Sequence, residues 1–94
     1  MTLLFLWLPS PQAALDRVAR RVQRGGHHVP AEVVIRRYKT GLANMRNVYL
    51  PIADVAAIYD NSDEGRALIA EQEPGLPFTV YDAVRWAMIE RASH

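Results

Sequence analysis

The 94-residue sequence contains no cysteine, which excludes disulfide bonds and thiolate metal sites and makes a cytoplasmic protein the simpler expectation. Long hydrophobic runs are also missing. The longest, residues 3–8, has only six residues, with no basic segment before it and no small-residue cleavage site after it. A signal peptide or a membrane span needs more than this, so we expect no membrane association.

Nucleotide-binding and hydrolase motifs are absent as well. The sequence has no GxxxxGK[ST] phosphate loop, no GxGxxG, no HExxH and no GxSxG. Its only lysine, Lys39, has no glycine loop before it. Phosphoryl transfer by this class of enzyme needs a loop that cradles the phosphates, so we do not expect this chain to carry out that reaction alone.

The composition is that of one small globular domain spanning residues 1–94, because half of the residues are hydrophobic and 22% are charged. A buried strand is expected first, then a pair of antiparallel helices, two more strands and a last helix. This order predicts an α/β fold. The expected ranges are a strand at 3–8, helices at 11–24 and 31–47, strands at 55–59 and 67–71, an extended piece at 78–81 and a helix at 82–92.

Local signals support the two central helices. Ser10 is a good N-cap, Pro11 suits the first helical position, and the pair Gly25-Gly26 ends the first helix. Gly41 weakens the second helix by about 1 kcal/mol relative to alanine, which indicates a close approach or a bend there. Pro51 is expected to kink or restart this helix.

Charge is distributed unevenly along the chain. Residues 1–50 hold eight basic and two acidic side chains (+6), whereas residues 51–94 hold three basic and eight acidic ones (−5). This asymmetry indicates a local anion site. Mutual attraction of the two halves would explain it equally simply, and both interpretations stay open.

Arginines form a stripe on the first helix, opposite its apolar face, and continue beyond the glycines. Guanidinium groups bind phosphate through a planar fork, so several arginines in one cleft suit a polyphosphate. The alternative is a solvated helix face. Such a face usually carries acidic partners, and Asp16 with Arg20 is the only well-spaced pair. The stripe consists of Arg17, Arg20, Arg21 and Arg24, followed by Arg36 and Arg37.

The segment Gly25-Gly26-His27-His28 indicates a flexible connection, either a lid hinge or a helix end. A helix end accounts for only one of the two glycines. Adjacent histidines point in different directions and no carboxylate lies at ligand spacing, so we expect no metal site. We expect His27 to touch a substrate or to cap the hinge. Asp60, which follows a strand, suits either a functional site or an ordinary turn, and the turn is favoured.

Residues 4–62 resemble the C-terminal half of the zeta-toxin-like P-loop kinases and related predicted ATPases. The matching motifs are L-x-x-P-S at the end of the first strand, R-V-x-x-R-V-x-x-G-G-H-x-V-P, R-[YF]-x-x-[GS]-L-x-N and a strand ending in D-N-S. The segment LIAE at 68–71 also fits. The combination of G-G-H-x-V-P with the following R-R-Y makes the resemblance specific.

The resemblance implies a partial P-loop-kinase-like fold with a small, mostly parallel sheet and a helical-hairpin lid. It also implies binding of ATP and Mg²⁺; characterised toxins of the family phosphorylate UDP-N-acetylglucosamine. Lid arginines close over the phosphates in this family. By motif position the corresponding residues here are Arg36 and Arg37 first, then Arg17, Arg21, Arg24 and His27.

A complete family member begins with a strand and a phosphate loop, which this sequence does not contain. We therefore expect the lid-containing C-terminal portion of such a protein, inactive alone, with residual nucleotide-phosphate binding and either a separate N-terminal half or a second copy as partner. The alternative is a non-catalytic interaction module that self-associates through open sheet edges. Nucleic-acid binding through the arginine stripe is a third and less favoured interpretation, and it would require a steep dependence on salt.

Overall fold

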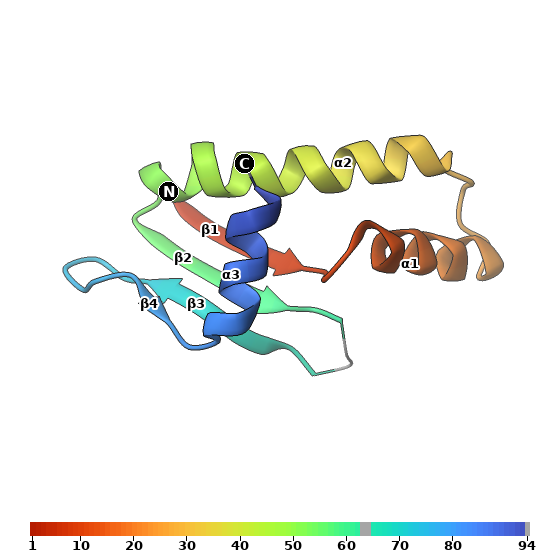
Figure 1. Cartoon of the computed structure of the whole chain (residues 1–94). Coiled ribbons are helices and arrows are strands. Elements are labelled where there is room, and N and C mark those ends of the chain that lie inside the picture. Colours follow the sequence, from red (N-terminus) through yellow and green to blue (C-terminus); the bar gives the residue numbers. More distant parts are fainter. Residues whose placement is uncertain (63–64, 94) are drawn as a thin grey trace.

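The computed structural model describes residues 1–62 and 65–93, and Figure 1 shows their arrangement. A four-stranded sheet and three α-helices confirm the expected α/β class. The elements are β1 (Thr2–Trp7), α1 (Pro11–Gln23), α2 (Ala31–Asn44), a π-helical segment η1 (Met45–Tyr49), a 3₁₀ turn η2 (Leu50–Ile52), β2 (Val55–Asp60), β3 (Ala67–Gln72), β4 (Thr79–Val80) and α3 (Ala83–Ala92).

The sheet has the strand order β1-β2-β3-β4, and only its first pair is parallel. The other two pairs are antiparallel, so the expectation of a mostly parallel sheet is wrong. The reason lies in the connections. The helical hairpin between β1 and β2 is long enough to return the chain to the same end of the sheet, whereas the connections 61–66 and 73–78 are too short for such a crossover.

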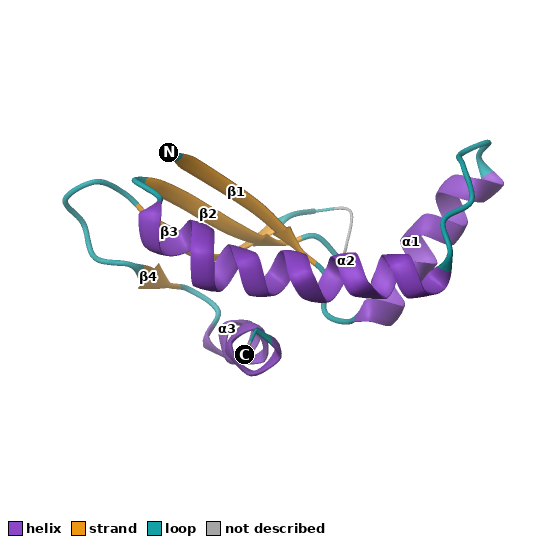
Figure 2. Ribbon diagram, turned by 90° about the horizontal axis from the view of Figure 1, so that it is seen from above, coloured by secondary structure: helices purple, strands orange, loops and turns teal. Residues whose placement is uncertain are grey.

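The continuous apolar run predicted that strand β1 would be buried on both faces. This prediction is wrong. The side chains of β1 alternate: Leu3, Phe5 and Trp7 pack on the core, while Leu4 and Leu6 on the other face are 59% and 36% exposed. The helices α2 and α3 lie on one side of the sheet (Figure 2), so only one face of β1 is covered. A continuous apolar sequence of this kind is typical of a central strand covered on both faces, but β1 lies at the edge of the sheet.

The core lies between the sheet and the helices α2 and α3 and is built from every layer of the fold. Its buried side chains are Trp7, Leu42, Met45, Ile58, Ile69, Ala70 and Ile89. Helix α1 contributes none of them and has no fully buried residue. The hairpin therefore extends beyond the packed body, and the Cα radius of gyration, 14.1 Å, exceeds the roughly 12 Å expected for a compact chain of this length.

The second helix differs from its expected range of 31–47. Its α-helical part ends at Asn44, and the chain continues through η1 and η2 to Ile52 without leaving helical geometry. Pro51 has no backbone N–H to donate to the carbonyl of Asn47, which is incompatible with a regular α-helix at this point. At the position where a restart was expected, the chain therefore forms the wider π-helical turn η1 and then the tighter 3₁₀ turn η2, which contains Pro51.

Both glycines after α1 have structural reasons. Gly25 has φ of +93°, a conformation that side chains disfavour, and its N–H caps the carbonyl of Val22. Gly26 donates to the carbonyl oxygen of Arg21 at 2.8 Å, and a Cβ on Gly26 would lie 2.8 Å from that same oxygen. The end of the helix therefore explains both glycines, contrary to the expectation that it accounts for only one.

Candidate functional site

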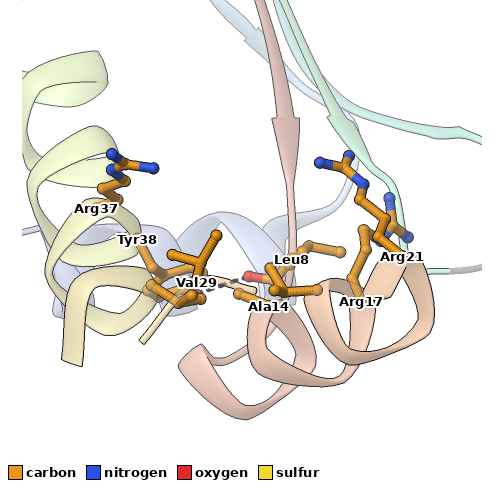
Figure 3. Close-up of a pocket in the computed structure, with 9 residues that line it drawn as sticks. Leu8, Ala14, Arg17, Arg21, Val29, Arg37 and Tyr38 are labelled. Carbon is orange, nitrogen blue, oxygen red and sulfur yellow. Dashed lines mark hydrogen bonds between the residues drawn. The ribbon is translucent and has the colours of Figure 1, made fainter. Parts of the chain in front are cut away.

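A cleft of about 350 Å³ opens between α1 and α2, beyond the carboxyl end of β1 (Figure 3). Its walls come from both helices, from the loop that joins them and from the residue after β1. Six of the nine lining side chains are apolar or aromatic and three are arginines. They are Leu8, Ala14, Arg17, Val18, Arg21, Val29, Val34, Arg37 and Tyr38.

Two hydrogen bonds attach the hairpin to the sheet around this cleft. The Tyr38 hydroxyl donates to the carbonyl oxygen of Leu8 at 2.7 Å, and Arg17 Nη2 donates to the carbonyl oxygen of Asn61 at 2.7 Å. Burial raises the pKa of Tyr38 above its ordinary value, which already keeps a tyrosine hydroxyl protonated at neutral pH. Leu8 and Asn61 directly follow the parallel strands β1 and β2, and the crevice outside the carboxyl ends of parallel strands is where open α/β sheets bind ligands.

Three guanidinium groups flank the cleft. Arg17 and Arg21 lie one turn apart on α1, and Arg37 extends from α2 on the opposite side (Figure 3). Among residues 1–62 and 65–93, no carboxylate lines the cleft and no ion pair includes any of these arginines. The cleft thus combines a positive rim with an apolar floor.

The other arginines predicted for the site lie outside the cleft. Arg24 lines a smaller hollow of about 290 Å³ on α1, together with Arg17, Arg20 and Arg21. Arg36 lines a third hollow on α2. His27 is exposed in the loop between the helices and is not among the residues that line the cleft. The structure therefore brings together Arg17, Arg21 and Arg37 but not the remaining predicted residues.

Sequence reasoning missed the floor of the cleft. Val29 and Val34 contribute to it, as does Val18, which the helical period placed only on an apolar face. An apolar residue in a hinge carries no signal of its own, and its role appears only when the two helices are seen side by side. Such a floor can hold the apolar part of a ligand whose anionic part is bound at the rim.

Asp60 has a structural role. It is 6% exposed and accepts hydrogen bonds from Ser62 N at 2.9 Å, Ser62 Oγ at 2.6 Å and Arg85 Nε at 2.6 Å. Burial alone would raise the pKa of this carboxyl, but the donors on Ser62 and the Arg85 guanidinium outweigh burial and lower the pKa. The turn interpretation of Asp60 is therefore confirmed, and Arg85 is used in holding that turn to α3.

No cluster of three or more potential metal ligands occurs among residues 1–62 and 65–93. Within the same ranges, no helix has both the length and the apolar character needed to cross a membrane.

A scan against models of known protein families finds no match to this chain, and searches of curated proteins and of solved structures find none either.

Proposed function

We propose that the cleft between α1 and α2 binds the phosphate groups of a nucleotide, and that the chain is the lid-containing portion of a zeta-toxin-like P-loop ATPase or kinase. The observation that carries the proposal is the convergence of Arg17, Arg21 and Arg37 on one cleft. Arg37 comes from a different helix than Arg17 and Arg21 and lies 20 and 16 positions after them, so a stripe on a single solvated helix face does not account for all three.

Phosphate is the anion that suits this arrangement best. Guanidinium groups donate two parallel hydrogen bonds to a phosphate and remain charged at every physiological pH. Two arginines on one wall and one on the other can contact a polyphosphate from both sides. Among the described residues no carboxylate lines the cleft to neutralise them, so a bound anion would supply the missing charge.

The chemistry assigned to this chain is binding and not phosphoryl transfer. The sequence has no phosphate loop, and the proposed family places the attacking and leaving groups on such a loop together with Mg²⁺. In this proposal ATP–Mg²⁺ is the ligand of the assembled kinase, and the arginines of this chain close over its phosphates. The R-V-x-x-R-V and R-[YF]-x-x-[GS]-L-x-N motifs contribute these arginines.

The test is a calorimetric titration of the purified chain with ATP, with and without Mg²⁺, and with tripolyphosphate. We expect saturable binding that is lost in an Arg21→Gln, Arg37→Gln double variant. The matched control is an Arg66→Gln, Arg91→Gln double variant, because it removes the same charge from exposed positions outside the cleft. Absence of saturable binding, or equal losses in both double variants, would contradict the proposal.

A second function is favoured by the exposed side of β1: self-association through its open edge. In the part of the chain that the structure describes, β1 pairs with β2 alone, and Leu4 and Leu6 are exposed beside its free edge. Natural edge strands are usually protected by a charge, a proline or a bulge, and residues 2–7 contain none of these. A second copy could pair its own β1 in the antiparallel direction and cover both sets of leucines.

Sedimentation velocity over a wide range of concentrations tests this second function. We expect a dimer that Leu4→Lys dissociates, because the substitution places a charge on the contact face. Val84→Lys is the matched control, since Val84 is 72% exposed and belongs to α3, not to β1. A chain that stays monomeric at millimolar concentration would exclude self-association.

A further inference from the structure

The fold gives no reason for the glycine at position 41. Gly41 lies inside α2, where glycine is unfavourable relative to alanine. Positive φ angles occur at Gly25 and Gly75 but not at Gly41, so its backbone is one that any residue could adopt. A Cβ added there would meet no atom within 4 Å, so packing does not require glycine either. No atom of the described chain outside this stretch of helix makes the close approach that the sequence indicated as one possibility at this position.

Gly41 does form part of a hollow of about 480 Å³ on the surface of α2. The residues of this hollow form two neighbouring rows on one helix face, because residues four apart in a helix lie next to each other. One row is Arg36, Thr40 and Asn44, and the other is Arg37 and Gly41. Each side chain in the hollow carries a hydrogen-bond donor, and no carboxylate of the described residues lines it. Glycine leaves the middle of this face without a side chain.

We infer that this hollow is a second anion-binding subsite and that it takes a phosphate group. The guanidinium of Arg36 would supply charge and a planar fork of donors, while the Thr40 hydroxyl and the Asn44 amide would supply neutral donors. The missing Cβ of Gly41 lets the phosphate approach the helix closely, which accounts for a residue that the fold alone does not explain.

The subsite lies beyond the cleft but next to it, because Arg37 lines both. Arg36, Thr40, Gly41 and Asn44 do not line the cleft, so the inference can stand or fall separately from the proposed function. Two phosphate positions joined by one arginine suit either two phosphorylated ligands bound together or one ligand with phosphates at both ends. This arrangement also gives Arg36 a role, although the structure does not place it with Arg17 and Arg21.

The experiment is a titration of the ¹⁵N-labelled chain with inorganic phosphate, followed by two-dimensional NMR. The backbone amides of Thr40 and Gly41 and the side-chain amide of Asn44 report on the subsite, while the amides of Ala14 and Val18 report on the cleft. We expect the first group to shift with its own dissociation constant. Arg36→Gln should weaken that binding by about tenfold, as expected for loss of a charge-assisted hydrogen bond.

Gly41→Ala separates binding from folding. Alanine favours the helix and has room, so the variant should melt at a higher temperature than the native chain while its subsite binds phosphate several-fold more weakly. Lys39→Gln is the matched charge control for Arg36→Gln, since Lys39 is exposed on α2 and lines neither hollow. It should leave both dissociation constants within about twofold.

The outcomes distinguish the two sites. If phosphate moves the signals of Ala14 and Val18 but not those of Thr40, Gly41 and Asn44, the cleft is supported and the second subsite is wrong. If only the second group moves, the subsite stands and the proposed function fails. Equal losses in Arg36→Gln and Lys39→Gln, or full binding in Gly41→Ala, would reduce the hollow to general attraction of anions by a basic surface.

Discussion

The α1–α2 hairpin and the body formed by the sheet and α3 use their charged side chains in opposite ways. In the body, Arg85 binds Asp60 and Asp82, and Glu90 of α3 is bound by Arg46 of η1, which lies 5.8 Å from the centre of the Trp86 ring. In the hairpin, the arginines along the cleft form no ion pair with any described carboxylate. The body's charges hold elements together. In the hairpin, Arg17 donates to the carbonyl oxygen of Asn61, whereas Arg21 and Arg37 have no ion-pair partner among the described residues.

The two regions also differ in how tightly their side chains are packed. The body buries Ile58, Ile69 and Ile89 completely, while α1 has no fully buried residue and leaves apolar hollows on both sides of its contact with α2. Stability should therefore reside mainly in the body. Within the hairpin this applies to α1, which has no fully buried residue, whereas α2 contributes Leu42 to the core. The uneven distribution of basic and acidic residues along the sequence reflects this division between hairpin and body.

The largest expected effect is in the body. Ile58→Ala should lower the free energy of unfolding by about 2–5 kcal/mol, because it leaves a cavity in a fully buried site. Val22→Ala in α1 should cost less than about 1.5 kcal/mol, the value for complete burial of its two methyl groups. Urea denaturation measures both. Similar losses would show that hairpin and body form one equally packed unit.

The next effect depends on pH. The Asp60 pKa is lowered in the fold, so the stabilisation by this carboxylate is complete above about pH 4, the ordinary aspartate pKa, and is lost as the pH falls through the lowered value. Asp60→Asn should cost about 1–3 kcal/mol at pH 7.

Urea denaturation at pH 7 and pH 3 measures the difference in free energy of unfolding between the native chain and the Asp60→Asn variant. This difference should be smaller at pH 3. Ser62→Ala removes only one of the donors to Asp60 and should give an intermediate loss at pH 7. A difference that is the same at both pH values would contradict the role assigned to the carboxylate.

A smaller effect is expected at the end of α1. Gly25→Ala should cost about 1–2 kcal/mol, because an alanine at φ +93° brings its Cβ close to the backbone. If the hairpin opens separately from the body, the loss should appear as faster amide hydrogen exchange in α1, with exchange in β2 unchanged. Uniform acceleration throughout the chain would show that the two regions unfold together.

The smallest expected effect on stability belongs to the cleft. Arg21→Gln should change the free energy of unfolding by no more than about 0.5 kcal/mol, because Arg21 is exposed and has no described ion-pair partner. It should nevertheless weaken the binding of ATP. Thermal unfolding with and without ATP measures both quantities. A large loss of stability without ligand would mean that Arg21 serves the fold.

Most of the secondary structure was predictable because its signals are local. Ser10 accepts from the Ala13 N–H as an N-cap should, Gly25 ends α1, and the turn after Asp60 is built by Ser62. The ends of α2 and the burial of β1 were predicted less well. A proline is visible in the sequence, but the wide turn before it depends on how Arg46 and Asn47 bind the end of α3.

The candidate site was only half predictable. The helical period placed Arg17 and Arg21 on one face of α1, but it could not show that Arg37 would meet them or that Arg36 would lie elsewhere. Adjacent residues of a helix point about 100° apart, so the direction in which the helices cross determines which of the two arginines faces the cleft.

The order of the elements, the caps of the helices, the cationic character of the hairpin and the turn at Asp60 therefore follow from the sequence alone, since each rests on neighbouring residues. Four features emerge only in three dimensions: the direction of β3 and β4, the edge position of β1, the apolar floor of the cleft, and the place of Arg37 but not Arg36 in that cleft. They depend on contacts between residues far apart in the chain, which no local preference encodes.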